Sequence, residues 1–308
     1  MKNKICQIFC FVAILISILI GFTLWGVLVV PPQFEETYQS VIVRQYDRYK
    51  SLGNNKIVLM GTSALAFGCD MDLLEELTGK KCQILGNHAG MATPYFVEMS
   101  KCNLQEGDIV IIQYSNYHAD SLGTDLLLTA IDNRVDMYQF FRPCNWDDVI
   151  LDYHNFLSKR LWYWTRGGYH AEDYYASSSF DENGNMIVER IGCEEKSPLD
   201  REKIKLDLGF NQDYIDYLND YISYCEERNV KVFFTVSTAL DEWVDATQEE
   251  CHEWDVKLQL LLNAPLISHR WDYLYPREYM YSLEHCNTIG AEVRTRQLYN
   301  DIKKYEEE

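Results

Sequence analysis

The chain has 308 residues, 47% of them hydrophobic, and a formal net charge of −19. This length is sufficient for one large domain with a buried core. The negative charge argues against nucleic-acid binding, which needs a basic surface to displace counterions from the phosphates. It also argues against flat adsorption to anionic lipid, and it is typical of a soluble domain outside the cytoplasm.

The N-terminus predicts a membrane anchor over residues 1–32. No charged residue occurs from Ile5 to Val30, and at 1.5 Å per residue such a run can cross a bilayer core of about 30 Å. The alternative is a cleaved signal peptide, whose apolar region would be about 7–15 residues long. The longer run here, ending in bulky residues, favours an uncleaved anchor. Lys2 and Lys4 favour a cytoplasmic N-terminus, which places the remainder outside the plasma membrane.

Residues 33–55 are expected to form a stalk or juxtamembrane helix, and residues 56–308 one α/β domain. The predicted strands are 57–60, 82–85, 108–113 and 230–236, with a weak fifth at 266–267; the predicted helices are 71–78, 91–101, 211–228 and 291–304. Apolar strands separated by helices predict a parallel sheet covered on both faces, a three-layer α/β/α architecture. Functional groups in such sheets gather at the carboxyl ends of the strands.

A long insertion, at about residues 120–205, separates the third and fourth predicted strands. Its aromatic residues include Tyr153, Trp162, Tyr163, Trp164, Tyr169, Tyr174 and Tyr175. Such side chains stack on sugar rings in some proteins, but the commoner role of aromatic residues is to form a core. The turn at residues 181–185 predicts a hairpin.

The sequence predicts no metal and no cofactor. It contains no Cys-x-x-Cys, and neither Cys251-His252 nor His285-Cys286 has zinc-site spacing. The loop from Gly61 to Gly68 lacks the signature of a phosphate loop or a dinucleotide fold, which argues against a flavodoxin-like nucleotide-binding domain. Two of the ten cysteines, Cys6 and Cys10, lie in the anchor; the other eight are compatible with either disulfides or reduced thiols.

Two segments far apart in the chain carry residues suited to acyl transfer. Ser63 follows the first apolar strand through a glycine-bearing turn, and His285 precedes the final helix. A serine hydroxyl is a weak nucleophile unless a positioned base takes its proton. Taken singly, Ser63 is a typical helix cap and Gly61 and Gly90 are ordinary turn glycines; their order along one α/β pattern favours a shared site.

These blocks resemble the SGNH (GDSL-like) hydrolase family, in particular its divergent membrane-anchored bacterial members. The matching segments are Gly61-Thr62-Ser63 with Phe67-Gly68-Cys69-Asp70, Gly86-Asn87-His88-Ala89-Gly90, Asn116, and His285-Cys286-Asn287 with Gly290. The resemblance implies a flavodoxin-like sheet, Ser63 as nucleophile and His285 as base. It also implies an oxyanion hole formed by the amides of Ser63 and Gly90 and the Asn116 side chain.

The chain departs from that family at the third member of the triad. The family places an aspartate three residues before the histidine, and Ser282 occupies that position here. Asp272, after the fifth strand, is our predicted replacement, with Glu284 as the alternative. Loss of the acid costs up to about 10⁴ in rate, which leaves open an inactive descendant of the family.

The resemblance implies an esterase or acyltransferase outside the membrane. Its expected partner is an acylated cell-envelope polysaccharide or a teichoic-acid-like polymer carrying acetyl or alanyl esters, and a membrane-bound acyl-transfer protein is a further expected partner. The alternative is a catalytically inactive protein of the same fold that binds envelope glycan or assists its assembly.

Overall fold

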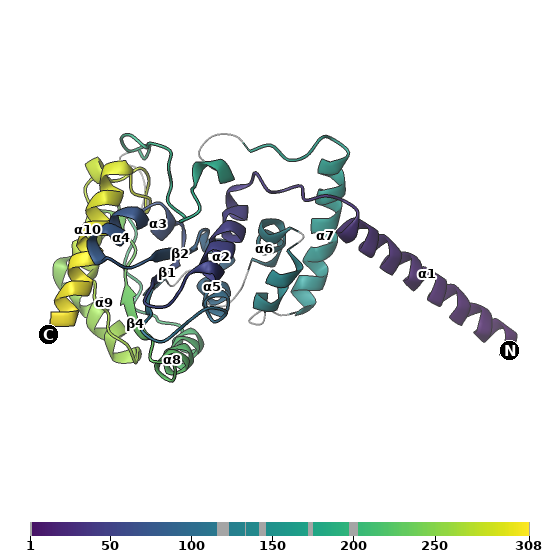
Figure 1. The fold of residues 1–308 in the computed structure, drawn as a ribbon, viewed down its shortest axis with the longest axis horizontal. Helices are drawn as coiled ribbons and strands as arrows, with labels where there is room; N and C mark the ends of the chain where they lie inside the picture. Colours follow the sequence, from purple (N-terminus) through teal and green to yellow (C-terminus); the bar gives the residue numbers. More distant parts are fainter. Residues whose placement is uncertain are drawn as a thin grey trace.

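The computed structural model describes residues 2–115, 123–132, 134–141, 146–171, 175–196 and 203–307. A parallel sheet of four strands in the order β2-β1-β3-β4 lies at its centre (Figure 1). The strands are β1 (Ile57–Gly61), β2 (Cys82–Gly86), β3 (Ile109–Gln113) and β4 (Lys231–Thr235). The first four predicted strands and the predicted α/β class are therefore confirmed.

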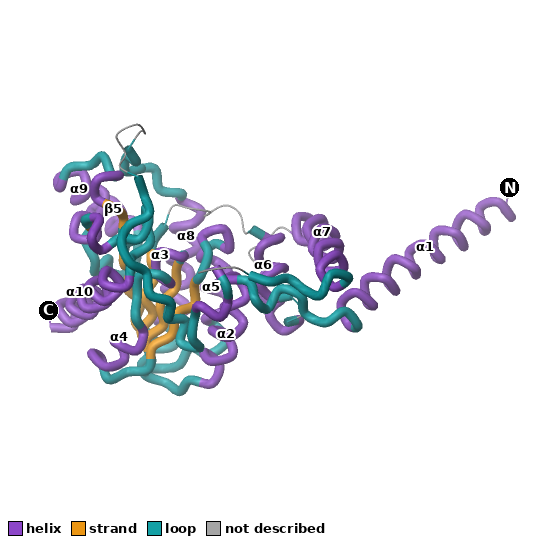
Figure 2. The backbone as a smooth tube through the Cα atoms, turned by 90° about the horizontal axis from the view of Figure 1, so that it is seen from above, coloured by secondary structure: helices purple, strands orange, loops and turns teal. Residues whose placement is uncertain are grey.

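Helices cover both faces of this sheet, as the view from above shows (Figure 2). Val58 and Met60 pack on one face in a core that includes residues of α2 (Val41–Ser51), α5 (Thr93–Ser100), α8 (Gln212–Glu226) and α9 (Gln248–Leu261). Ile57 and Leu59 point to the opposite face, toward α4 (Met71–Thr78) and α10 (Thr288–Glu307). Because alternate strand residues are buried on opposite sides, the strands appear in the sequence as continuous apolar runs.

Capping side chains set the limits of several helices. The Asp70 carboxylate accepts a hydrogen bond from the Leu73 amide at 3.0 Å at the start of α4, and Gly79 ends this helix with φ +68°. Asn211 caps α8 in the same manner. Thr247 and Glu250 form a reciprocal capping box at the start of α9. These contacts satisfy amides that would otherwise lack an acceptor in the first turn.

The weak fifth strand is reduced to a single parallel bridge between Phe234 and Leu266. The Phe234 amide donates to the Pro265 carbonyl at 2.8 Å, and the Ile267 amide donates to the Phe234 carbonyl at 2.9 Å. A second sheet, which the sequence does not predict, pairs β5 (Ala239–Leu240) with β6 (Leu274–Tyr275) in parallel. Strands of two residues carry too little periodicity to be recognised.

Short helices make up most of the remaining regular structure. They are α3 (Ser63–Ala66) and the 3₁₀ helices η1 (Tyr38–Ser40), η2 (Ala89–Met91), η3 (Val135–Phe141), η5 (Ser177–Ser179), η7 (Asp241–Trp243), η8 (Arg270–Tyr273) and η9 (Arg277–Tyr279).

The described part of the predicted insertion contains two α-helices, α6 (Thr124–Ile131) and α7 (Trp146–Trp164). Tyr163 and Tyr169 pack edge to face with ring centroids 5.3 Å apart, and both contact Phe34. These aromatic side chains therefore contribute to a core, whereas Trp162 and Trp164 are exposed. Tyr174 lies outside the described residues.

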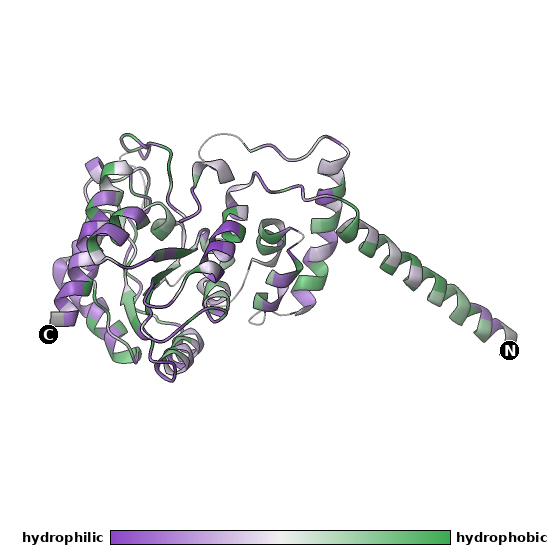
Figure 3. Ribbon diagram, viewed as in Figure 1, coloured by the Kyte–Doolittle hydropathy of each residue, from purple (hydrophilic) through white to green (hydrophobic). Residues whose placement is uncertain are grey.

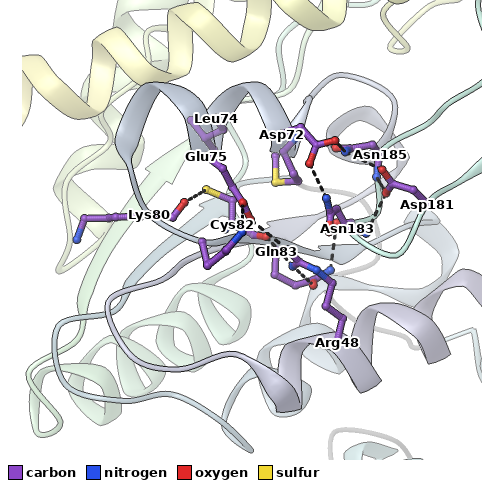
Figure 4. Close-up of polar contacts among 12 residues, drawn as sticks. Arg48, Asp72, Leu74, Glu75, Lys80, Cys82, Gln83, Asp181, Asn183 and Asn185 are labelled. Atoms are coloured by element: carbon purple, nitrogen blue, oxygen red, sulfur yellow. Dashed lines mark hydrogen bonds and ion pairs between the residues drawn. The ribbon is translucent and has the colours of Figure 1, made fainter.

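The predicted hairpin turn at residues 181–185 is closed by an antiparallel bridge between Phe180 and Met186. Figure 4 shows how polar side chains attach this turn to α4. The Asn183 amide donates to the Asp72 carboxylate at 2.5 Å, and the Asn185 amide contacts both Asp72 and Asp181. The turn thereby fixes the insertion against the edge of the sheet at β2.

The N-terminal helix α1 (Lys2–Leu28) projects away from the rest of the molecule (Figure 1). Within it, Lys4–Gly26 is long and apolar enough to cross a membrane, with a mean hydropathy of 2.7, and its most apolar window is not buried against the domain. The following segment, residues 33–55, contains α2, whose buried residues Ile42, Tyr46 and Tyr49 belong to the main core. This segment is thus a helix within the domain and not a free stalk.

Candidate active site

Ser63 lies at the carboxyl end of β1, as the first residue of α3. Thr62 caps this short helix, its hydroxyl oxygen accepting from the Ala64 amide at 3.3 Å. Gly61 is needed at the strand end, because a Cβ there would lie 2.6 Å from the Gln113 side-chain oxygen. As the first helical residue, Ser63 has a backbone amide with no acceptor inside the helix.

His285 lies in the loop between β6 and α10. Residues 280 and 286 form an antiparallel bridge, and the amides of Tyr281 and Ser282 both donate to the His285 carbonyl, at 2.8 and 3.2 Å. At the start of α10, the Asn287 side-chain oxygen accepts from the Gly290 amide at 2.9 Å. This tight loop fixes the direction in which the His285 ring points.

The structure brings His285 and Ser63 together. The Nε2 atom of His285 lies 2.9 Å from the Ser63 Oγ, although 222 positions separate the two residues. The Phe67 ring stacks on the imidazole with centroids 4.3 Å apart and planes inclined by 12°. For Ser63 to donate its proton, Nε2 must be the unprotonated nitrogen and Nδ1 must carry the ring hydrogen.

None of the predicted acids contacts the other ring nitrogen. His285 Nδ1 is buried and has no hydrogen-bond partner among the described residues. Asp272 is exposed, and its backbone carbonyl accepts from the Gln297 amide. Glu284 lines a separate cavity with Arg270; burial raises the pKa of its carboxyl, and the Arg270 charge opposes this rise. The structure therefore brings neither Asp272 nor Glu284 to the imidazole.

A buried cation lies near the ring in place of an acid. Arg190 is 4% exposed, and its guanidinium donates to the Phe67 carbonyl at 3.1 Å and forms no ion pair within the described part of the chain. Burial, together with the positive charge of Arg190, lowers the pKa of His285 to about 4. The imidazole is accordingly held in its neutral form.

The predicted oxyanion donors are only partly available in this arrangement. The Gly90 amide donates to His88 Nδ1 at 3.0 Å, so it can bind an oxyanion only after the His88 ring turns away. The Ser63 amide opens α3 and has no acceptor inside that helix. Asn116 lies outside the described residues.

Several side chains at this site were not predicted from the sequence. Gln113, at the end of β3, donates to the Thr62 hydroxyl at 3.2 Å and to the Ser237 hydroxyl, which links the ends of three strands. A polar residue closing an apolar strand is a signal that could have identified Gln113. Arg190 comes from the insertion, and nothing in its local sequence indicates that it lies beside His285.

A cavity of about 330 Å³ lies close to this pair, on the side of β4. Ser237 and Glu284 line it together with Tyr114, Trp254 and Arg270. It thus combines aromatic surfaces with a few polar and charged groups, a composition found in small-molecule pockets. Glu284 adjoins His285 in the chain, but neither Ser63 nor His285 lines this cavity.

No protein-family model matches this sequence, and no curated protein matches it significantly. Within the described ranges, no cluster of three or more histidine, cysteine, aspartate and glutamate side chains could hold a metal ion. The nine cysteines of that part of the chain are all free thiols.

Proposed function

We propose that this protein is a membrane-anchored esterase or acyltransferase of the SGNH (GDSL-like) type. Its substrate would be an acyl ester of a cell-envelope polysaccharide or a teichoic-acid-like polymer outside the membrane. The observation that carries the proposal is the hydrogen bond between Ser63 Oγ and His285 Nε2. It lies at the carboxyl ends of parallel strands, where α/β sheets bind their ligands.

The fold supports the finer assignment of a flavodoxin-like, SGNH-type sheet. The strand order β2-β1-β3-β4, followed by the parallel bridge at Leu266 beside β4, corresponds to the order 2-1-3-4-5 of doubly wound sheets. Helices on both faces agree with this architecture. The apolar helix α1, preceded by Lys2 and Lys4, supports an anchor with a cytoplasmic N-terminus.

In the proposed reaction, Ser63 Oγ attacks the ester carbonyl while His285 Nε2 takes its proton. The tetrahedral oxyanion is bound by the Ser63 amide, with Gly90 and Asn116 as the other donors implied by the resemblance. Collapse breaks the ester bond, and His285 returns the proton to the departing sugar oxygen. Water or a second hydroxyl then resolves the acyl-enzyme by the reverse sequence, which gives hydrolysis or transfer respectively.

One observation favours the second candidate, a non-catalytic protein of this fold that binds envelope glycan or assists its assembly. His285 Nδ1 has no acceptor within the described part of the chain, and the nearby charge of Arg190 is positive. In serine hydrolases an aspartate stabilises the imidazolium at this position, and its loss costs about 10⁴ in rate. The site thus combines the geometry of a nucleophile–base pair with poor stabilisation of the protonated base.

A fluorophosphonate probe applied to the full-length protein in detergent tests the nucleophile. We expect labelling of the wild type, none of Ser63→Ala, and labelling of His285→Gln slowed by at least about 10²-fold, the lower range for general-base catalysis. Ser237→Ala is the matched control, because its hydroxyl lies at the same edge of the sheet and contacts Gln113, whereas His285 contacts Ser63. Equal labelling of wild type and Ser63→Ala would exclude the nucleophile. Absent labelling together with glycan binding that survives Ser63→Ala would favour the non-catalytic candidate.

A further inference from the structure

Helix α7 carries an apolar stripe along one side. Trp146, Ile150, Leu157, Leu161 and Trp164 fall within about 60° of the helix circumference at 3.6 residues per turn. Asp147, Asp148 and Lys159 point in other directions around the same helix. Apart from Leu151 and Trp162, which lie on other faces, the helix is therefore amphipathic; its buried residues Val149 and Phe156 lie beside the stripe, and Leu157 within the stripe is itself buried.

The C-terminal half of this stripe contacts the end of the membrane helix α1. Gly26 lies against Leu157, where a Cβ would collide with the leucine side chain. Trp25 and Trp164 pack edge to face with centroids 5.5 Å apart. The Arg160 guanidinium donates to the Gly26 carbonyl at 2.8 Å and thereby fixes this junction.

The residues in the N-terminal half of the stripe are exposed. Trp146 is 53% exposed and Ile150 is 65% exposed. In Figure 1, α7 stands at the end of the domain from which α1 departs, and Figure 3 shows apolar residues on both helices. A membrane that surrounds α1 up to its junction with α7 would reach this surface.

We propose that α7 lies in the outer interfacial layer of the bilayer that α1 spans, with Trp146 and Ile150 inserted among the lipids. Tryptophan is enriched at membrane–water interfaces, and an amphipathic helix lies in that layer with its apolar face among the lipid chains. The continuity of the stripe with the α1 contact identifies lipid as its occupant. The helix would then hold the domain in a fixed orientation and keep the Ser63 region close to the membrane surface.

The test reconstitutes the full-length protein in vesicles of phosphatidylcholine and phosphatidylglycerol, with or without phosphatidylcholine brominated on its acyl chains. Bromine quenches only tryptophans that reach about 5–10 Å into the boundary of headgroups and chains, the depth of an interfacial helix. We expect Trp146→Phe to reduce the tryptophan fluorescence lost to bromine by about a third, because Trp146 is one of three tryptophans on this surface, with Trp25 and Trp164. Trp271→Phe, in η8, should leave the quenched intensity unchanged.

A second pair of variants separates insertion from local structure. Ile150→Asp should reduce quenching because it places a charge in the stripe, whereas Leu151→Asp should not, because that exposed residue lies on another face of the same helix. Circular dichroism of each variant should match the wild type. If Trp146→Phe leaves the quenched intensity unchanged, the proposal is overturned, and a second copy or another protein would be the occupant of the stripe.

Discussion

His285 is in an environment that differs from that of the histidine in a complete triad. The Phe67 ring covers one face, Arg190 is buried nearby, and Nδ1 has no carboxylate within the described part of the chain. Burial and the positive charge of Arg190 both oppose protonation of the ring, and no carboxylate stabilises the imidazolium. The same features keep the ring neutral, and a neutral ring is what a base needs before it takes the serine proton. His285 is therefore unprotonated and can accept the serine proton, but its protonated form is poorly stabilised.

The pH dependence of Ser63 labelling follows from this environment. With the pKa of His285 lowered to about 4, the labelling rate should stay level from pH 8 to 5 and reach half its value near pH 4. An ordinary histidine would lose half its activity near its unperturbed pKa of about 6.5. Labelling by the fluorophosphonate probe across this range measures the midpoint. A midpoint near 6.5 would contradict the assignment of a buried, positively flanked base.

The same shift affects stability with a definite sign. Below about pH 6.5 the unfolded ring binds a proton, whereas the folded ring does not until about pH 4. The free energy of unfolding should therefore fall as the pH drops through this window, by on the order of 3 kcal/mol from this residue. Urea titrations at pH 7 and pH 4.5 measure the difference, and His285→Gln should reduce it.

Removal of the neighbouring cation should raise the pKa of His285. Arg190→Met keeps the length of the side chain but removes the charge that opposes protonation. The histidine resonance that is lost in His285→Gln can be followed by NMR titration, and its midpoint should move upward from about 4. Arg44→Met is the control, because this guanidinium also binds carbonyl oxygens but lies at Ser177 and Phe180. Equal midpoints in all three proteins would show that Arg190 has no electrostatic role.

The orientation of His285 depends on how α10 meets the loop before it. Gly290 lies in the first turn of α10, directly against the Tyr279 backbone, and a Cβ at this position would overlap the Tyr279 carbonyl oxygen. The backbone amide of Asn287 donates to the same carbonyl at 3.0 Å. The glycine therefore permits the close approach that holds residues 279–287 as one unit.

Gly290→Ala should break this unit. Alanine is favoured over glycine in a helix by about 0.5–1 kcal/mol, but overlap with backbone costs about 1–3 kcal/mol, so the variant should be less stable and label poorly at Ser63. Gly53→Ala is the control, because nothing lies within 4 Å of its added Cβ. Thermal unfolding and probe labelling of both variants provide the measurement. A Gly290→Ala protein with unchanged stability and labelling would show that the loop does not need this contact.

Across the whole molecule, the parts that local sequence determines were predictable and the rest were not. The four strands are apolar on both faces, so each appears as an uninterrupted run, and α4 begins and ends at the residues that its cap and its glycine indicate. The serine and histidine blocks could be paired because a parallel sheet gathers its strand ends at one edge. The surroundings of His285 could not be predicted, since Arg190 reaches it from the insertion through a long-range fold that has no local signal.

The junction between α1 and the domain depends on a buried ion pair that no sequence pattern indicates. The Arg160 Nε lies 3.0 Å from the Asp132 carboxylate, and the guanidinium also donates to the carbonyls of Gly26 and Val30. Asp132 in turn accepts from the Phe34 amide at 3.1 Å. One buried pair thus connects the end of the N-terminal apolar helix α1, the segment that follows it, and helices α6 and α7.

Removal of one partner of the Arg160–Asp132 pair should lower the free energy of unfolding far more than removal of a partner from an exposed ion pair beside it. Arg160→Met leaves Asp132 buried without a counter-charge, which typically costs about 3–5 kcal/mol. Lys159→Met, one residue earlier, breaks the exposed pair with Asp125 at 2.9 Å and should cost about 0–1 kcal/mol. Urea unfolding of the full-length protein in detergent compares the two variants. Asp132→Asn combined with Arg160→Met should recover part of the loss, because the uncompensated charge is then gone. Equal losses in the Lys159 and Arg160 variants would mean that this ion pair does not hold α1 to the domain.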